Sequence, residues 1–238
     1  MTEFESLGVI YIVFGERAIE EAKYSARTVK ETSGLQVAVF CDSPVESEYF
    51  DKVTLIEREN QRPKVDYVYE SPFECTLYLD SDTRVTSDIT DMFQILHRFD
   101  VAGAQDYARK SFRWATKIPA YDAIPYCFSE FNGGVLLFRK NERTSRFFGL
   151  WREYYRRYFE ITQQDQPSLR MALYNSDVRI HTLPPEYNVR NQSSRNQLRR
   201  RAINHQKDLH VPRILHWHGL NKRWPLAGLL PKYRAMKF

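Results

Sequence analysis

Cysteine is scarce in the sequence: only Cys41, Cys75 and Cys127 are present, and no two of them form a CxxC pair. Their odd number and wide spacing exclude a disulfide framework or a zinc knuckle and favour a reducing compartment. No apolar run approaches the roughly 20 residues that a helix needs to cross a bilayer. The first residues are acidic rather than basic, and no small-residue cleavage site follows them, so a secretory signal is not expected. The sequence therefore predicts a cytoplasmic protein, with at most peripheral membrane contact.

The remaining composition is that of an ordinary globular protein. The chain has 238 residues, of which 42% are hydrophobic and 27% charged, with a net charge of +5. A chain of this length can bury a large core within one domain. The positive charge attracts anions, but it does not separate phosphorylated ligands from nucleic acid or acidic lipid.

Apolar, β-branched runs alternate with helical patterns along most of the chain. Residues 7–14 form a continuous apolar run that is typical of a strand buried on both faces; Gly15 ends it, and a helical pattern follows at residues 17–32. The order strand, helix, strand predicts a right-handed crossover and a parallel sheet. Further strands are expected at residues 35–40, 52–56, 75–79, 101–105 and 135–139, and further helices at residues 63–70, 90–97, 142–159 and 166–174.

The predicted α/β fold directs attention to the carboxyl ends of the strands, where ligands bind in open sheets. Residues 107–131 follow one such strand and are rich in Tyr, Phe and Pro, with weak periodicity. A loop of that length inside a domain is usually functional, so we interpret it as a lid or an acceptor wall rather than a plain surface insertion.

The strand at residues 75–79 ends directly in Asp80, Ser81 and Asp82. On an extended chain the side chains at i and i+2 point to the same side, so the two carboxylates are expected to converge. Carboxylates that lie close together repel each other unless a cation lies between them, and hard oxygen donors suit Mg²⁺ or Mn²⁺. A turn explains the same triplet as well, because Asp and Ser favour strand ends and helix caps.

A second group of polar residues lies in ILHWHGLNKRW, at residues 214–224. An imidazole at a strand end, here His216, can complete a metal shell that two carboxylates begin. Gly219 lets the backbone approach a ligand closely, and Lys222 supplies a mobile charge suited to a diphosphate. Taken singly, His216 fits a core histidine and Lys222 a solvated side chain; in the spacing HxxGxxKxW they favour a ligand site.

The DxD triplet and the HxxGxxKxW motif, in this order and separation, resemble the retaining sugar-nucleotide transferases of the glycosyltransferase A fold, the group that includes glycogenin and the bacterial lipopolysaccharide galactosyltransferases. The resemblance runs from residue 7 to residue 224. It implies one Rossmann-like domain with a mixed, mostly parallel sheet, a nucleotide-binding half at residues 7–106, an acceptor and catalytic half at residues 107–224 and a tail at residues 225–238. The sequence departs from the family at Arg223, where proline is usual, and near Arg170, where an asparagine is common.

The resemblance also implies roles for individual residues. Asp80, Asp82 and His216 would bind a divalent metal, Mn²⁺ or Mg²⁺. Asp165 and Gln166, in QQDQPSL, would lie beside the reacting carbon as catalytic residues. Asn132 lies in FNGGVLLF and Lys64 in RPKVDYVYESPFE, both similar to donor-binding segments; the full set implied for the donor is Phe14, Gly15, Lys64, Asp80, Ser81, Asn132, Gly219 and Lys222. LPPEYNV, at residues 183–189, is similar to a family segment to which we assign no role.

Simpler interpretations stay open for the middle motifs. Asp165 also fits a helix N-cap, because Pro167 follows in the first turn. Asn132, placed before two glycines, also fits a turn that opens a strand. Asp106 follows an expected strand and could bind an acceptor hydroxyl or be a solvated loop carboxylate. The basic run from Arg195 to Arg201 fits a solvated helix face first, and alternatively a contact with an anionic acceptor or a membrane surface.

The sequence thus predicts a metal-dependent glycosyltransferase that moves a sugar from a nucleoside diphosphate sugar, a UDP-hexose by resemblance, to a hydroxyl acceptor such as a glycan, with retention. Inversion stays open, with Asp165 as general base. A sugar nucleotidyltransferase would need a glycine-rich basic loop after the first strand, where only Gly15, Glu16 and Arg17 are found. A nucleic-acid-binding protein would depend on the basic run alone; no nucleic-acid-binding module is recognisable, so no such partner is expected.

Overall fold

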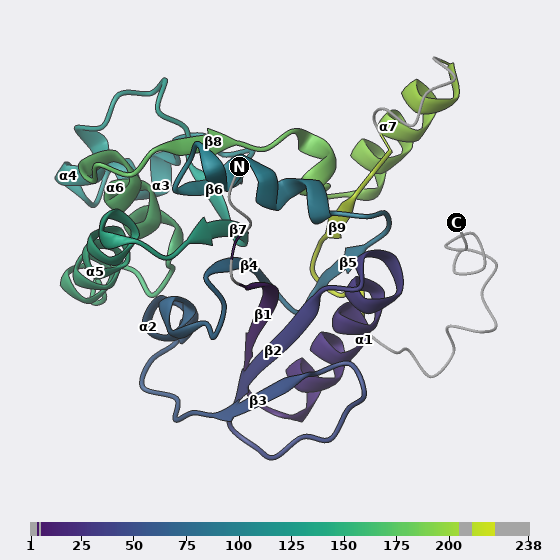
Figure 1. Ribbon diagram of the computed structural model, residues 1–238. Helices are drawn as coiled ribbons and strands as arrows, with labels where there is room; N and C mark the ends of the chain where they lie inside the picture. Colours follow the sequence, from purple (N-terminus) through teal and green to yellow (C-terminus); the bar gives the residue numbers. More distant parts are fainter. Residues whose placement is uncertain (1–3, 5, 205–210, 222–238) are drawn as a thin grey trace.

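In the computed structural model, which describes residues 4, 6–204 and 211–221, a seven-stranded sheet runs through the centre of the protein (Figure 1). Its strands lie in the order β3-β2-β1-β4-β7-β6-β8. Only β7 is antiparallel to its two neighbours, and the remaining neighbouring pairs of this sheet are parallel. The strands are β1 (Leu7–Val13), β2 (Gln36–Cys41), β3 (Lys52–Leu55), β4 (Cys75–Leu79), β6 (Val101–Gln105), β7 (Phe131–Arg139) and β8 (Ile180–Thr182). The predicted α/β fold with a mixed, mostly parallel sheet is confirmed.

Both faces of the central strands are buried, which is why apolar residues follow one another in them without alternation. In β1, Val9 and Tyr11 pack into the core on one face, whereas Ile10 packs into the core on the other. The first face is covered by α1 (Glu16–Ser33) and the 3₁₀ helix η2 (Thr90–His97). The second face is covered by α2 (Lys64–Tyr67), α5 (Glu142–Arg157) and α6 (Gln166–Asn175).

Local sequence fixes where two of these helices begin. Gly15 precedes α1 with a φ of 82°, in the left-handed region that favours glycine. At the start of α5, Asn141 accepts a hydrogen bond from the Thr144 N–H, and the Thr144 hydroxyl accepts one from the Asn141 N–H. This reciprocal cap satisfies two N–H groups that a helix start otherwise leaves unpaired.

Most predicted elements lie within two residues of their expected bounds, and β4 and β6 match at both ends. The strand expected at residues 135–139 begins earlier, at Phe131, because two glycines in the middle of β7 conceal its first half from a propensity argument. The helix expected at residues 63–70 is α2 followed by the 3₁₀ helix η1 (Val68–Glu70).

The long loop expected at residues 107–131 is a wrong prediction in part. It contains two short helices, α3 (Phe112–Ala115) and α4 (Pro119–Asp122). Each helix is a single turn, too short to show helical periodicity. Trp114 and Tyr121 from these helices are buried together with Ile118 and Ile124, so the segment has a small core of its own.

A second, two-stranded sheet joins the middle of the chain to its end. β5 (Thr83–Val85) pairs antiparallel with β9 (Ile214–His216), and Thr83 lies opposite His216. Val189, after the 3₁₀ helix η3 (Pro185–Tyr187), bridges to β9, and α7 (Gln192–Asn204) follows. This pairing brings a residue from the end of the chain to the carboxyl end of β4.

The predicted halves of the domain share the seven-stranded sheet. Residues 7–106 supply five of its strands, β1 to β4 and β6, and residues 107–224 supply β7 and β8. The predicted tail at residues 225–238 lies outside the described residues. Among the helices that the structure describes, none has both the length and the hydropathy that spanning a membrane requires.

Candidate functional site

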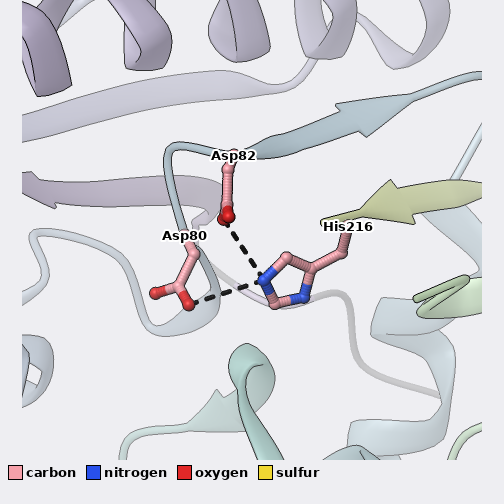
Figure 2. Close-up of side chains that lie close together, drawn as sticks. All are labelled: Asp80, Asp82 and His216. Carbon is pink, nitrogen blue, oxygen red and sulfur yellow. Dashed lines mark ion pairs between the residues drawn. The ribbon is translucent and has the colours of Figure 1, made fainter. Parts of the chain in front are cut away.

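Two carboxylates and one imidazole converge where β4 ends (Figure 2). Nε2 of His216 lies 3.6 Å from Oδ2 of Asp80 and 3.3 Å from Oδ1 of Asp82. The backbone between the two aspartates is a turn, closed by a hydrogen bond from the Thr83 N–H to the Asp80 carbonyl. The expected extended geometry was therefore wrong, but the expected convergence of the two carboxylates is found. The pairing of β5 with β9 brings His216 to the same turn.

The second nitrogen of the imidazole is held by an asparagine. Oδ1 of Asn188 lies 2.9 Å from Nδ1 of His216, whereas Nη1 of Arg190 lies 3.3 Å from the same nitrogen. The shorter contact, to an acceptor oxygen, assigns a proton to Nδ1 and leaves Nε2 facing the two aspartates. Metal-binding histidines are commonly oriented in this way by a hydrogen bond at the other nitrogen.

These three side chains fit a divalent cation. One ligand atom from each lies within 4.8 Å of the others. Two carboxylate oxygens and one imidazole nitrogen suit Mn²⁺ or Mg²⁺. Burial lowers the pKa of His216, but hydrogen bonds to Asp80 and Asp82 outweigh burial and raise that pKa above its ordinary value. A cation between these groups would take the place of the proton on Nε2.

Strand β7 approaches the cluster so closely that only glycine fits. A Cβ atom added to Gly134 would overlap Oδ2 of Asp80 and Cε1 of His216. The Gly134 carbonyl also accepts a hydrogen bond of 2.9 Å from the Asp80 N–H. At Gly133, an added Cβ would lie 3.3 Å from Oδ2 of Asp165. The two glycines of FNGGVLLF therefore make room for protein side chains of the site.

Lys64 links the metal-binding candidates to the catalytic candidate. Its Nζ lies 3.0 Å from Oδ2 of Asp165 and 3.4 Å from Oδ1 of Asp80. Burial lowers the pKa of Lys64, but Asp165 and Asp80 outweigh burial and raise that pKa. Burial likewise raises the pKa of Asp80, but Lys64 and His216 hold it well below its ordinary value. Both groups are therefore charged at neutral pH.

Asp165 and Gln166 lie at the start of α6, as predicted. Asp165 occupies the N-cap position of α6, as the simpler interpretation expected, but its side chain makes no capping hydrogen bond to the helix. Instead, its Oδ1 lies 3.5 Å from Nε of Arg62. The Gln166 side chain donates a hydrogen bond of 2.6 Å to the Phe131 carbonyl, which ties α6 to the first residue of β7.

Asn132 and Asp106 lie side by side, from β7 and from the residue after β6. Nδ2 of Asn132 donates to Oδ2 of Asp106 at 3.2 Å, and Oδ1 of Asn132 accepts from the Gly134 N–H at 3.1 Å. Asn132 is thus a buried strand residue, and its interpretation as a turn residue was wrong. Asp106 also accepts a hydrogen bond from the Ala108 N–H.

The other donor-binding candidates lie around this centre without a described contact to the metal-binding candidates. Phe14 and Gly15 follow β1, where the Gly15 N–H donates to the Asp42 carboxylate and Arg58 lies 5.9 Å from the centre of the Phe14 ring. The Ser81 carbonyl accepts a hydrogen bond from Asn221. Gly219 has a φ of 81°, and Lys222 lies outside the described residues.

Sequence reasoning missed three contributors to the site. Tyr78 donates a hydrogen bond of 2.6 Å to Oδ1 of Asp80, Arg62 pairs with Asp165, and Asn188 holds His216. Asn188 lies in LPPEYNV, the segment to which we assigned no role. Tyr78 lies two residues before Asp80 on the strand, so the period of two could have identified it. No comparable signal marks Arg62.

The basic run at the start of α7 is only partly a solvated face. Arg195 and Leu198 are buried, whereas Arg200 is exposed. Near this helix start, the Ser194 hydroxyl lies 3.0 Å from the Tyr107 hydroxyl. Arg195, being buried, does not contribute to a basic surface for nucleic acid.

Comparison with known proteins agrees with this arrangement. The family described as glycosyl transferase family 8 matches residues 66–226. Among solved structures, the galactosyltransferase LgtC in complex with donor and acceptor sugar analogs has a TM-score of 0.61 and 14% identity, over 89% of this chain and 87% of that one. No curated protein sequence matches the chain at a significant level.

Two further glycosyltransferase structures share the fold over part of their length. GlyE of Streptococcus pneumoniae TIGR4 has a TM-score of 0.60 and 18% identity, over 90% of this chain and 54% of that one. The bifunctional WbbM has a TM-score of 0.59 and 14% identity, over 91% of this chain and 46% of that one. At these identities the likeness establishes the glycosyltransferase A fold. Because the family match also covers more than half of the chain, the protein is a glycosyltransferase that belongs to glycosyl transferase family 8.

Proposed function

We propose that this glycosyltransferase moves a hexose from a UDP-hexose to a hydroxyl group of a glycan acceptor, with retention at the anomeric carbon and with Mn²⁺ or Mg²⁺ as cofactor. The observation that carries the proposal is the convergence of Asp80, Asp82 and His216 at the carboxyl end of β4. Family membership and the sugar analogs bound by LgtC support the donor and acceptor classes.

Charge develops on two groups during such a transfer. The bond between the anomeric carbon and the diphosphate breaks through an oxocarbenium-like state, and negative charge grows on the leaving diphosphate. The bound cation would supply Lewis-acid stabilisation of that charge. Asp80, Asp82 and His216 would hold the cation, while Lys64 keeps the Asp80 and Asp165 carboxylates in place through two contacts. Lys222 would add a second cation at the diphosphate.

The surroundings of Asp165 favour retention over inversion. An inverting enzyme needs a general base that takes the proton of the acceptor hydroxyl. Asp165 is buried, and its two oxygens face Lys64 and Arg62. Taking a proton would break these pairs and leave Lys64 with one carboxylate. A carboxylate held by two cations is better suited to stabilise positive charge on the sugar, a role that Asp165 and Gln166 would share.

The proposal is tested by incubating the protein with a panel of sugar nucleotides and Mn²⁺ and measuring donor hydrolysis, so that the acceptor need not be known. We expect turnover of a UDP-hexose and a loss of about 100-fold or more in Asp82→Asn, because a ligand to the charge-stabilising cation is weakened. The matched control is Asp88→Asn, an exposed aspartate of the same chain segment. Equal rates in the two variants would show that the metal site is wrongly assigned.

The stereochemical part has its own measurement. Proton NMR of the glycosylated product, recorded before anomeric exchange, reports whether the new bond has the configuration of the donor. Retention is expected. Inversion would assign Asp165 as the general base, although the glycosyltransferase activity itself would stand.

A further inference from the structure

A hollow of about 320 Å³ lies between α3 and the connection from α5 to α6. Arg113, Trp114 and Lys117 line one side, and residues 159–164 line the other. The volume lies at the lower end of the range for small-molecule sites, roughly 300–1,000 Å³. Trp114 is buried against Met171 of α6 and Tyr158 of the connection, so the wall formed by α3 is fixed in place.

The hollow reaches the catalytic candidate through one residue. Gln164 lines the hollow, and its side-chain oxygen accepts a hydrogen bond of 2.6 Å from Nη2 of Arg62. The same arginine pairs with Asp165, the next residue along the chain. A molecule in the hollow would therefore lie beside the group that faces the reacting carbon. None of the metal-binding candidates lines the hollow.

The lining of the hollow is mostly polar, with little apolar surface. Thr162 carries a hydroxyl, and Gln163 and Gln164 carry amides that can donate and accept hydrogen bonds. Trp114, Phe159 and Ile161 contribute apolar surface, and Ile161 is 44% exposed. Convergent hydroxyl and amide groups with little apolar surface beside them suit a ligand that is rich in hydrogen-bonding groups, such as a sugar.

The two cations that line the hollow are not paired with any acid among the described residues. Arg113 stacks over the Trp114 ring at 4.5 Å, and neither Arg113 nor Lys117 forms an ion pair within the part of the chain that the structure describes. On the nearby helix α5, by contrast, Arg157 pairs with Glu153. Glu160 is the one acid in the lining, against two cations. The hollow therefore favours an anion, as does the net charge of +5.

We propose that this hollow binds an anionic sugar residue of the acceptor, carrying a carboxylate or a phosphate, next to the residue that receives the hexose. The inference rests on the proposed function and adds the class of acceptor to it. Arg113 and Lys117 make charge-assisted hydrogen bonds to the anion. Thr162 and Gln163 bind the hydroxyl groups of the ring.

The test is a titration of the full chain, without divalent metal, with three probes: methyl β-D-glucuronide, glucose 6-phosphate and the neutral methyl β-D-glucoside. Leaving out metal keeps the phosphate probe from binding at the aspartates. We expect the anionic probes, or the one whose anion the acceptor carries, to bind about tenfold more tightly than the glucoside. Combining Arg113→Gln with Lys117→Gln should abolish that difference. Lys52→Gln, at an exposed lysine of β3, is the matched control and should keep it.

Several results would overturn the inference: no binding of either anion, equal binding of all three probes, or unchanged anion binding in the double variant. Donor hydrolysis by the same preparations reports separately on the proposed function. Turnover without selective anion binding would contradict the proposed role of the hollow but leave the proposed glycosyl transfer unaffected. Selective anion binding that depends on Arg113 and Lys117, without turnover, would support the proposed role of the hollow and contradict the proposed reaction.

Discussion

The side-chain oxygen of Asn188 lies 2.9 Å from Nδ1 of His216, on the side of the imidazole that faces away from Asp80 and Asp82. The contact fixes both the ring orientation and the tautomer, because the proton on Nδ1 leaves the Nε2 lone pair for a metal. Asn188 follows η3 and directly precedes Val189, which bridges to β9. Backbone pairing therefore holds β9, which carries His216, between β5 and the segment that carries Asn188.

The substitution Asn188→Ala should weaken metal binding without removing a ligand. We expect the Mn²⁺ concentration for half-maximal donor hydrolysis to rise about 10- to 100-fold, the usual effect of losing an outer-sphere partner of a metal-bound histidine. Asn175→Ala is the matched control, because Asn175 is exposed and the described hydrogen bond of its side chain is to the Tyr154 hydroxyl. An unchanged Mn²⁺ response in Asn188→Ala would contradict the role of Asn188 in orienting His216 for metal binding.

Glycine at position 134 is a requirement of the same cluster. In Gly134→Ala the methyl group would push Asp80 and His216 apart, so we expect loss of Mn²⁺-dependent hydrolysis and destabilisation by about 1–3 kcal/mol. Gly149→Ala is the comparison, because Gly149 is an exposed residue inside α5 with open space around its Cβ position. It should stabilise the protein by about 0.5–1 kcal/mol. Urea unfolding measures the stability of both variants, and titration with Mn²⁺ measures their hydrolysis; unchanged hydrolysis in Gly134→Ala would contradict the prediction.

The parts of the fold that the sequence predicts well are those with a strong local pattern. β4 and β6 are buried runs bounded by polar residues, and both ends match the prediction. By contrast, β5 and β8 are three residues long, less than the period of two needs to become visible, whereas the equally short β9 was expected only as a strand end at His216. Their formation depends on tertiary pairing, such as that of Thr83 with His216.

The site divides in the same way. The sequence was sufficient to identify Asp80, Asp82 and His216 as candidates. Few residue types bind metals, and the spacing of the DxD and HxxGxxKxW motifs narrowed the number of candidate positions. The role of Arg62 could not be identified in this way, since its contact with Asp165 joins residues that are far apart in the chain. Gly133 and Gly134 were considered as part of a turn that opens a strand, whereas in the structure they make room for Asp165, Asp80 and His216.

Acid sensitivity should come from Asp100, which is fully buried before β6. Its carboxylate accepts hydrogen bonds from Arg139 of β7, from Arg179 before β8 and from Asn141. Burial raises the pKa of Asp100, but these hydrogen bonds outweigh it and hold the pKa well below its ordinary value. Because the folded pKa lies below the unfolded value of about 3.9, this stabilisation is present above about pH 5 and is lost as pH falls further.

Replacing that carboxylate should remove both the stability and its pH dependence. Asp100→Asn is expected to cost about 3 kcal/mol at neutral pH, the lower end for a broken buried pair because Arg179 and Arg143 are half exposed. Its unfolding free energy should then fall less steeply between pH 5 and pH 3 than that of the wild type. Asp177→Asn, an exposed partner of Arg146, should change stability by no more than about 0.5 kcal/mol. A parallel acid profile in Asp100→Asn would contradict this assignment.

Arg170 holds the segment at residues 107–131 against α6. It is fully buried, and its guanidinium donates to the carbonyls of Phe128, Tyr121 and Pro125 at 2.9, 3.0 and 3.0 Å, with the Tyr121 ring 4.6 Å away. In Arg170→Met these buried carbonyls lose their donor, so we expect destabilisation by about 3 kcal/mol or more.

Hydrogen exchange distinguishes this local role from a general loss of stability. In Arg170→Met the amides of residues 119–128 should exchange faster than in the wild type under native conditions, while those of β1 and β4 keep their relative protection. Arg146→Met is the control, because Arg146 is an exposed arginine of α5 whose pairs with Glu142 and Asp177 contribute little. Uniform acceleration across the sheet would mean that Arg170 supports the whole core. Unchanged exchange at residues 119–128 would mean that the four-residue helices hold the segment without it.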